Sequence, residues 1–205
     1  MSFVMFAGCK YFGMFIGERR TVNTEHEIID ENAIKVKRIN DNLIVAGAGC
    51  EGIAKLIFEY LSKKEKLTFD KAIEVLNQNY SLIYNRFLKL TNSKDNPNDP
   101  FYSNLGILSL YNGKIAFADI MIKNEYIRIT PHYYETDDDI SFCYLAKGLG
   151  GLPNYFSNEF YKNPVFTIQN IKSVFYKTLK DNIQNDYTIN DRFILEYIIR
   201  EDLLC

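Results

Sequence analysis

The sequence contains no tryptophan, only two histidines and only four cysteines. The two histidines, His26 and His132, are far apart in the chain and lie in loop-like contexts, so we assign neither a catalytic role. The cysteines lack the spacing of a metal site, and so few in a chain of 205 residues do not suggest a disulfide framework. We therefore predict no metal, no cofactor and a reducing, cytoplasmic environment.

The sequence also lacks a large net charge of either sign, and it lacks long apolar runs. Its formal charge is −2, and the basic residues alternate with acidic ones, which leaves no basic surface for nucleic acid. No apolar run approaches the length that spans a bilayer. The first residues do not form a signal peptide, because a basic start is missing and Lys10 interrupts the apolar run. We expect a soluble single domain over residues 1–205, without nucleic-acid or membrane binding.

Apolar and β-branched runs predict strands that are arranged as hairpins. FVMFAGCKYFGMFIGE predicts two strands with a turn near Lys10–Tyr11, the second strand ending at Glu18. AIKVKRINDNLIVAGAG predicts a second pair, with the turn at Asn40–Asn42 and LIVAGAG as the buried strand. Farther along, strands are separated by Asn112–Gly113, which is a hairpin signal, and by Lys123–Asn124. RFILEYIIRE predicts a closing strand.

Apolar residues at helical spacing predict helices in EGIAKLIFEYLSKK, in TFDKAIEVLNQNYSLIYNRFLKL and in TIQNIKSVFYKTLKDNIQND. Thr68 and Thr167 are the expected N-caps of the last two. The order along the chain is strands, two helices, strands, one or two helices, and a strand. This order predicts an α+β fold in which two antiparallel sheets are flanked by helices, a four-layer αββα sandwich.

Four strings occur in a characteristic order: GMFIGERR, ENAIKVKRINDNLIVAGAG, the helix pair that follows it, and YLAKGLGG with NDYTINDRFILEYII. Together they resemble the proteasome β-subunit family, which belongs to the N-terminal-nucleophile (Ntn) hydrolases. The resemblance extends over nearly the whole chain. It implies the αββα fold and an amidohydrolase or peptidase whose nucleophile is the first residue of the mature chain.

In that family the nucleophile lies a fixed strand length before an acidic residue, and counting back from Glu18 gives Ser2. Initiator Met1 is normally removed before a small residue, which would leave Ser2 with a hydroxyl and a free α-amine. The amine can act as the base that activates the hydroxyl. The resemblance implies that Lys35 places a cation beside the hydroxyl, that Glu18 holds Lys35, and that the Gly49 amide stabilises the oxyanion.

The resemblance also assigns supporting residues. Asp186, together with Thr188, is the counterpart of the family residues that orient the terminal amine. The residues implied for the substrate pocket are Arg20, Thr21, Gly47, Cys50 and Glu51, with Arg20 also giving structural support. We expect Glu51 to favour a basic or polar group beside the scissile bond, unless its carboxylate caps the helix that begins there.

Several alternatives remain open at this point. Lys35 and Lys37 share one strand face, so either lysine can point inward. The family's serines near the amine are absent, because their positions carry KGLGG and YTIN. A catalytically inactive structural subunit in an oligomeric scaffold is therefore the alternative to a peptidase. The expected partners are a peptide or amide substrate and further copies of the chain, whereas a partner ATPase, ring formation and aminolysis stay undecided.

Overall fold

The computed structural model describes residues 3–22, 27–91, 102–147 and 151–200. Within these ranges the chain forms eleven strands and four helices. In chain order they are β1 (Phe3–Gly8), β2 (Phe12–Glu18), β3 (Thr21–Val22), β4 (Ile28–Asp30), β5 (Val36–Asn40), β6 (Leu43–Gly49), α1 (Glu51–Ser62), α2 (Phe69–Thr91), β7 (Tyr102–Tyr111), β8 (Lys114–Lys123), β9 (Tyr126–Tyr134), β10 (Ser141–Lys147), α3 (Leu152–Phe160), α4 (Ile168–Asn182) and β11 (Phe193–Ile199).

The first large sheet has four antiparallel strands in the order β10-β1-β2-β11. Its centre is the predicted hairpin of β1 and β2, and β2 ends at Glu18 as expected. The predicted closing strand is β11, which pairs with β2 so that Phe193 lies opposite Glu18. The start of β11 is thereby held beside Glu18.

The second large sheet has five antiparallel strands in the order β5-β6-β7-β8-β9. The predicted turn between β7 and β8 is present, and both its residues have positive φ, 50° at Asn112 and 72° at Gly113. Such paired positive values match the twist of the flanking strands in a two-residue hairpin. Gly49 ends β6 opposite Ser103 of β7.

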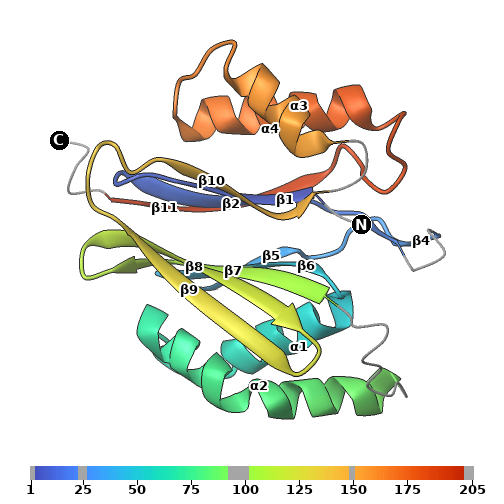
Figure 1. Cartoon of the computed structure of the whole chain (residues 1–205), viewed down its shortest axis with the longest axis vertical. Coiled ribbons are helices and arrows are strands. Elements are labelled where there is room, and N and C mark those ends of the chain that lie inside the picture. Colours follow the sequence, from blue (N-terminus) through green and yellow to red (C-terminus); the bar gives the residue numbers. More distant parts are fainter. Residues whose placement is uncertain (1–2, 23–26, 92–101, 148–150, 201–205) are drawn as a thin grey trace.

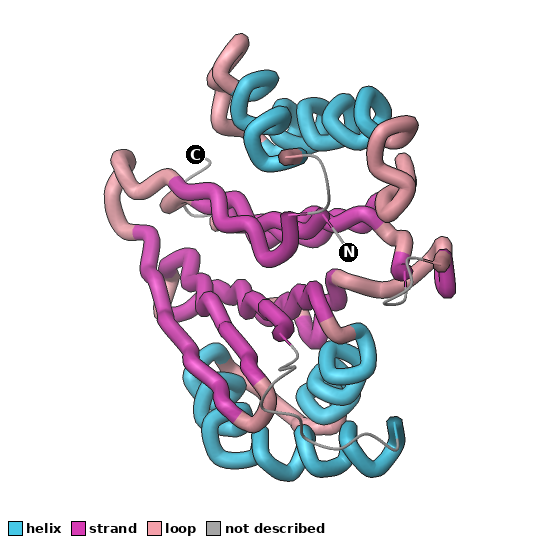
Figure 2. The backbone as a smooth tube through the Cα atoms, turned by 45° about the vertical axis from the view of Figure 1, so that its right-hand side comes forward, coloured by secondary structure: helices cyan, strands magenta, loops and turns pink. Residues whose placement is uncertain are grey.

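The two large sheets face each other, and helices lie on their outer sides (Figure 1). Figure 2 shows from a second direction that α3 and α4 accompany the four-stranded sheet, whereas α1 and α2 accompany the five-stranded sheet. Alternate residues of β1 enter different cores, as the strand period of two requires. Phe3 stacks on Phe175 of α4 with ring centroids 4.9 Å apart, whereas Phe6 stacks on Phe117 of the other sheet at 4.1 Å.

The prediction of antiparallel sheets combined with helices is confirmed. One detail was not predicted. β3 and β4 form a two-stranded sheet of their own, and each is too short to show an alternating pattern. The sequence left open whether one or two helices precede the closing strand, and the structure has two, α3 and α4. Helix α3 begins directly after Gly151, whose φ of 76° lets the chain turn into it.

Candidate active site

Glu18 and Lys35 form a buried ion pair that joins the end of β2 to the residue before β5. Glu18 is the last residue of β2 and is fully buried, and Lys35, just before β5, is 6% exposed. The Lys35 ammonium donates to Glu18 Oε1 and also to the backbone carbonyl of Arg20. Lys37 is only half-buried. Of the two lysines, Lys35 is therefore the one that points inward.

The remaining contacts of the Glu18 carboxylate come from the backbone. Oε2 accepts the Arg20 N–H at 2.6 Å, and Oε1 accepts the Phe3 N–H at 3.2 Å. Hydrogen bonds of this kind compensate the cost of burying a charged pair, which would otherwise exceed the attraction between the charges. The contacts that hold the pair therefore come from three segments of the chain: Phe3, residues 18–20 and Lys35.

Burial acts on both members of the pair. It raises the pKa of Glu18 above its usual range, and the nearby Lys35 opposes the shift. It lowers the pKa of Lys35, and the charge and hydrogen bond of Glu18 oppose this shift, with Glu51 contributing in the same sense. Lys35 is thus removed from water, and the hydrogen-bond acceptors around its ammonium favour the protonated form.

The proposed nucleophile lies outside the described residues. Ser2 belongs to the undescribed start of the chain, and the described part begins with Phe3. Ser2 is nevertheless bonded covalently to the Phe3 nitrogen, and that nitrogen lies 3.2 Å from Glu18 Oε1, the oxygen that also binds Lys35.

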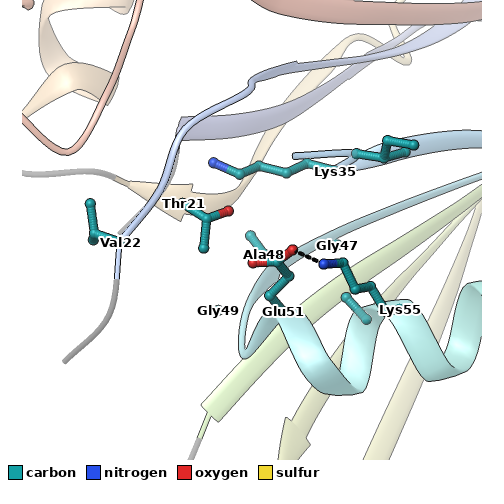
Figure 3. Close-up of a pocket in the computed structure, with 10 residues that line it drawn as sticks. Thr21, Val22, Lys35, Gly47, Ala48, Gly49, Glu51 and Lys55 are labelled. Carbon is teal, nitrogen blue, oxygen red and sulfur yellow. Dashed lines mark ion pairs between the residues drawn. The ribbon is translucent and has the colours of Figure 1, made fainter. Parts of the chain in front are cut away.

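A small pocket opens beside the buried pair (Figure 3). Lys35 and Thr21 lie on one side of it in this view, and Gly47, Ala48 and Glu51 lie on the other. Of the residues implied by the sequence, the structure brings these together in the pocket wall: Thr21, Lys35, Gly47, Gly49 and Glu51. The rest of the lining was not predicted and consists of Val22, Ile34, Ala48, Ala54 and Lys55.

Two glycines shape the pocket wall. Gly49 has a φ of 99°, and a Cβ there would lie 2.6 Å from the Tyr102 carbonyl oxygen, so the position requires glycine. A Cβ on Gly47 would lie 3.0 Å from Cβ of Ala54. The missing side chain lets α1 pack closely on β6, which keeps the pocket small.

Glu51 begins α1 and forms an ion pair with Lys55, one turn farther along the helix (Figure 3). The Glu51 side chain is 25% exposed and that of Lys55 is 63% exposed. We expected a Glu51 carboxylate that was available to a basic group of the substrate. In the structure this carboxylate pairs with Lys55, a partner that the i,i+4 spacing could have revealed, and the preference for a basic or polar substrate group stays a prediction.

Two residues that we expected in the pocket lie elsewhere. Cys50 is half-buried and packs against the core beneath α1, where burial raises the pKa of its thiol. The Arg20 guanidinium binds Glu31 and the Tyr187 carbonyl, and neither Cys50 nor Arg20 is among the residues that line the pocket. Arg20 contacts the buried pair through its backbone.

Asp186 is buried in the segment that precedes β11. Its Oδ1 accepts the Thr188 N–H at 3.0 Å and also the Thr188 hydroxyl, and both residues are fully or almost fully buried. The neighbouring Tyr187 carbonyl accepts a hydrogen bond from Arg20 NH1 at 2.6 Å. This segment therefore lies against the residues that hold the buried pair.

The described residues include no group of three or more histidine, cysteine, aspartate or glutamate side chains that could hold a metal. Among the helices of the same ranges, none is long and apolar enough to cross a membrane.

Two facing antiparallel sheets with helices on their outer sides, together with the buried Glu18–Lys35 ion pair, characterise the fold and its candidate site (Figure 1). Among solved structures, the crystal structure of eukaryotic HslV from Trypanosoma brucei is similar, with a TM-score of 0.54 and 14% sequence identity. The match covers 96% of this chain and 99% of that chain. No protein-family model matches the sequence, and no curated protein sequence matches it. The likeness shows the fold, and activity is a separate question.

Proposed function

We propose that the chain is an N-terminal-nucleophile amidohydrolase or peptidase that uses Ser2 after removal of Met1. One observation carries the proposal. The buried Lys35 ammonium and the Phe3 N–H share one oxygen of Glu18, and Phe3 is the residue bonded to Ser2. Consecutive Cα atoms are about 3.8 Å apart, and the proposal requires the Ser2 hydroxyl to lie beside the Lys35 ammonium.

The chemistry follows from these groups. The Ser2 hydroxyl attacks the carbonyl carbon of an amide, and its proton passes to the Ser2 α-amine, directly or through water. The Lys35 cation favours the developing alkoxide and lowers the affinity of the amine for a proton. Collapse of the tetrahedral intermediate breaks the C–N bond, and the leaving amine takes the proton from the α-amine. Water then cleaves the ester between Ser2 and the acyl group.

The oxyanion of the tetrahedral intermediate needs preorganised donors, and we assign this role to the Gly49 amide. Gly49 lines the same pocket as Lys35, and its backbone conformation is available to glycine and strained for other residues. Loss of one such donor typically costs a hundredfold or more in rate. We assign Asp186 with Thr188 to orienting the amine.

The arrangement of the sheets and helices supports the same class. We infer that the helices on the outer sides of the two facing sheets make this the αββα sandwich of the Ntn hydrolases (Figure 1). We further expect the chain to assemble with copies of itself, which light scattering of the purified protein would measure.

A covalent probe tests the proposal. Intact mass spectrometry should find that the mature chain begins at Ser2, and a β-lactone or an epoxyketone peptide should add once per chain, at Ser2. Ser2→Ala should abolish labelling, and Ser2→Thr should retain it. Ser173→Ala is the matched control, because Ser173 is an exposed serine of α4 that bonds only the Gln169 carbonyl among the contacts described.

Retention of Met1, or labelling that survives Ser2→Ala, would contradict the proposal. An unlabelled chain that starts at Ser2 and assembles into a stable oligomer would favour the inactive scaffold subunit instead. The absence of the family's amine-positioning serines is the observation that favours the inactive subunit as the second candidate.

A further inference from the structure

Arg20 connects the buried pair to the segment that carries Asp186. Its backbone N–H donates to Glu18 Oε2 at 2.6 Å, and its backbone carbonyl accepts from Lys35. Its guanidinium donates to the Tyr187 carbonyl at 2.6 Å. One residue therefore contacts both charged partners through its backbone and the closing segment through its side chain.

Glu31 holds Arg20 in this position. Its two carboxylate oxygens accept from Arg20 Nε at 3.1 Å and from NH2 at 3.0 Å, a bidentate arrangement that fixes the guanidinium plane. The Asn190 side-chain amide donates to Glu31 Oε2 at 2.8 Å and to the Glu31 carbonyl at 3.1 Å. Asn190 is 3% exposed, so its polar side chain is buried against these partners.

The contacts continue on the other side of Asn190. Its Oδ1 accepts the Arg19 N–H at 3.3 Å, which ties it to the backbone between Glu18 and Arg20. Hydrogen bonds from Asn190 and then from Arg20 lower the pKa of Glu31, so Glu31 is a carboxylate at neutral pH. Glu31 thus joins the closing segment to the residue whose backbone binds the buried pair.

We propose that Glu31 is a positioning residue for the Glu18–Lys35 pair and that it acts through Arg20 and Asn190. Lys35 is buried and depends on two acceptors, Glu18 and the Arg20 carbonyl. If Arg20 moves, Lys35 loses one acceptor and its ammonium shifts within the pocket. The proposal deepens the proposed function and rests on it for its catalytic consequence, whereas its effect on Lys35 is measurable without any reaction.

The exposure of Glu31 makes the test discriminating. Its side chain is 41% exposed, and an ion pair at such a position usually adds little to stability. A merely structural Glu31 would therefore leave the titration of Lys35 unchanged. A positioning residue would alter it.

The first measurement is the pH titration of the Lys35 side-chain nitrogen by NMR, with its signal assigned by its loss in Lys35→Met. Glu31→Ala should move the titration to lower pH, because a buried ammonium with fewer acceptors releases its proton more readily. Glu31→Gln keeps an oxygen acceptor for Arg20 and Asn190 and should restore most of the wild-type behaviour.

Glu135→Ala is the matched control. Glu135 is also a partly exposed carboxylate in an ion pair, 2.8 Å from Lys114 at the far end of the five-stranded sheet from Gly49. Its removal should leave the titration of Lys35 as it is in the wild type. The same variants are then compared in the rate of β-lactone labelling, which we expect to fall about tenfold in Glu31→Ala, since small displacements of reacting groups cost this much or more.

A folded Glu31→Ala chain with the wild-type titration of Lys35 would overturn the proposal. If that variant does not fold, Glu31→Asp decides, because it keeps the charge but withdraws the carboxylate by one methylene. A Lys35 titration in Glu31→Asp that is identical to the wild type would equally overturn the proposal. A wild-type chain that is not labelled at Ser2 would refute the proposed function and leave the titration as the test of positioning.

Discussion

Two glutamate–lysine pairs border the same pocket, and they differ in almost every physical respect. Glu18 ends β2, Lys35 directly precedes β5, and both are buried, with exposures of 0% and 6%. Glu51 and Lys55 lie one turn apart on α1, and the lysine side chain is 63% exposed. The first pair has further backbone partners from Phe3 and Arg20.

The two pairs contain the same two residue types, so burial is the physical property that distinguishes them. A buried pair is costly to break, because the remaining charge has no water to solvate it. An exposed pair contributes little and can exchange its partner with a substrate. We therefore assign the first pair to the reaction and the second to the adjustable wall of the pocket.

The largest effect is expected from Lys35→Met, which leaves the Glu18 carboxylate buried without its cation. The free energy of unfolding should fall by about 3–5 kcal/mol, as measured by urea denaturation, and labelling at Ser2 should disappear. Combining Lys35→Met with Glu18→Gln should recover much of the stability and none of the labelling. Wild-type labelling in either variant would contradict the role given to the pair.

The next largest effect is expected from Gly49, which lines the pocket that the two ion pairs border. Gly49→Ala should reduce the free energy of unfolding by about 1–3 kcal/mol, because the new Cβ meets the Tyr102 carbonyl in a strained backbone conformation. Gly113→Ala is the matched control, since Gly113 has a φ of 72° but open space where its Cβ would lie. Equal losses in the two variants would show that contact with Tyr102 is unimportant.

The pH dependence of labelling gives a third test of the buried pair. The rate should rise as the Ser2 α-amine loses its proton, at about pH 7.7–8.0 or below. It should fall again when Lys35 loses its proton, and because burial lowers the pKa of Lys35, this decline should begin below the usual lysine range. A rate that stays level up to the ordinary range of lysine would contradict this account.

The smallest effect is expected from Lys55→Ala, which breaks the exposed pair. The free energy of unfolding should change by less than about 1 kcal/mol. The freed Glu51 carboxylate should raise the labelling rate of an epoxyketone with a basic side chain, relative to one with a small apolar side chain, by about fivefold, or about 1 kcal/mol. Lys63→Ala breaks the comparable Glu59–Lys63 pair of α1 away from the pocket and should leave the ratio unchanged.

Local sequence signals predicted much of the fold. The Asn112–Gly113 turn, the strand that ends at Glu18 and the N-cap at Thr167, which accepts the Asn170 N–H at 3.2 Å, all depend on neighbouring residues. The strands β3 and β4 were not predicted, because segments of two and three residues are too short to show a hydrophobic period.

The site was predictable only where spacing carries information. The family-like strings GMFIGERR and ENAIKVKRINDNLIVAGAG pointed to Glu18 and Lys35, but a strand period of two could not separate Lys35 from Lys37. Burial separates them in the structure. Asn190 lies 159 residues from Glu31, and nothing in the local sequence of either residue indicates their contact.

The decisive experiment is a crystal structure of the mature chain in which the first residue is visible. We expect the chain to begin at Ser2, with its hydroxyl oxygen and its α-amine within hydrogen-bonding range of Lys35 Nζ, about 3 Å. A retained Met1, or a Ser2 hydroxyl turned away from Lys35 and out of the pocket, would contradict it.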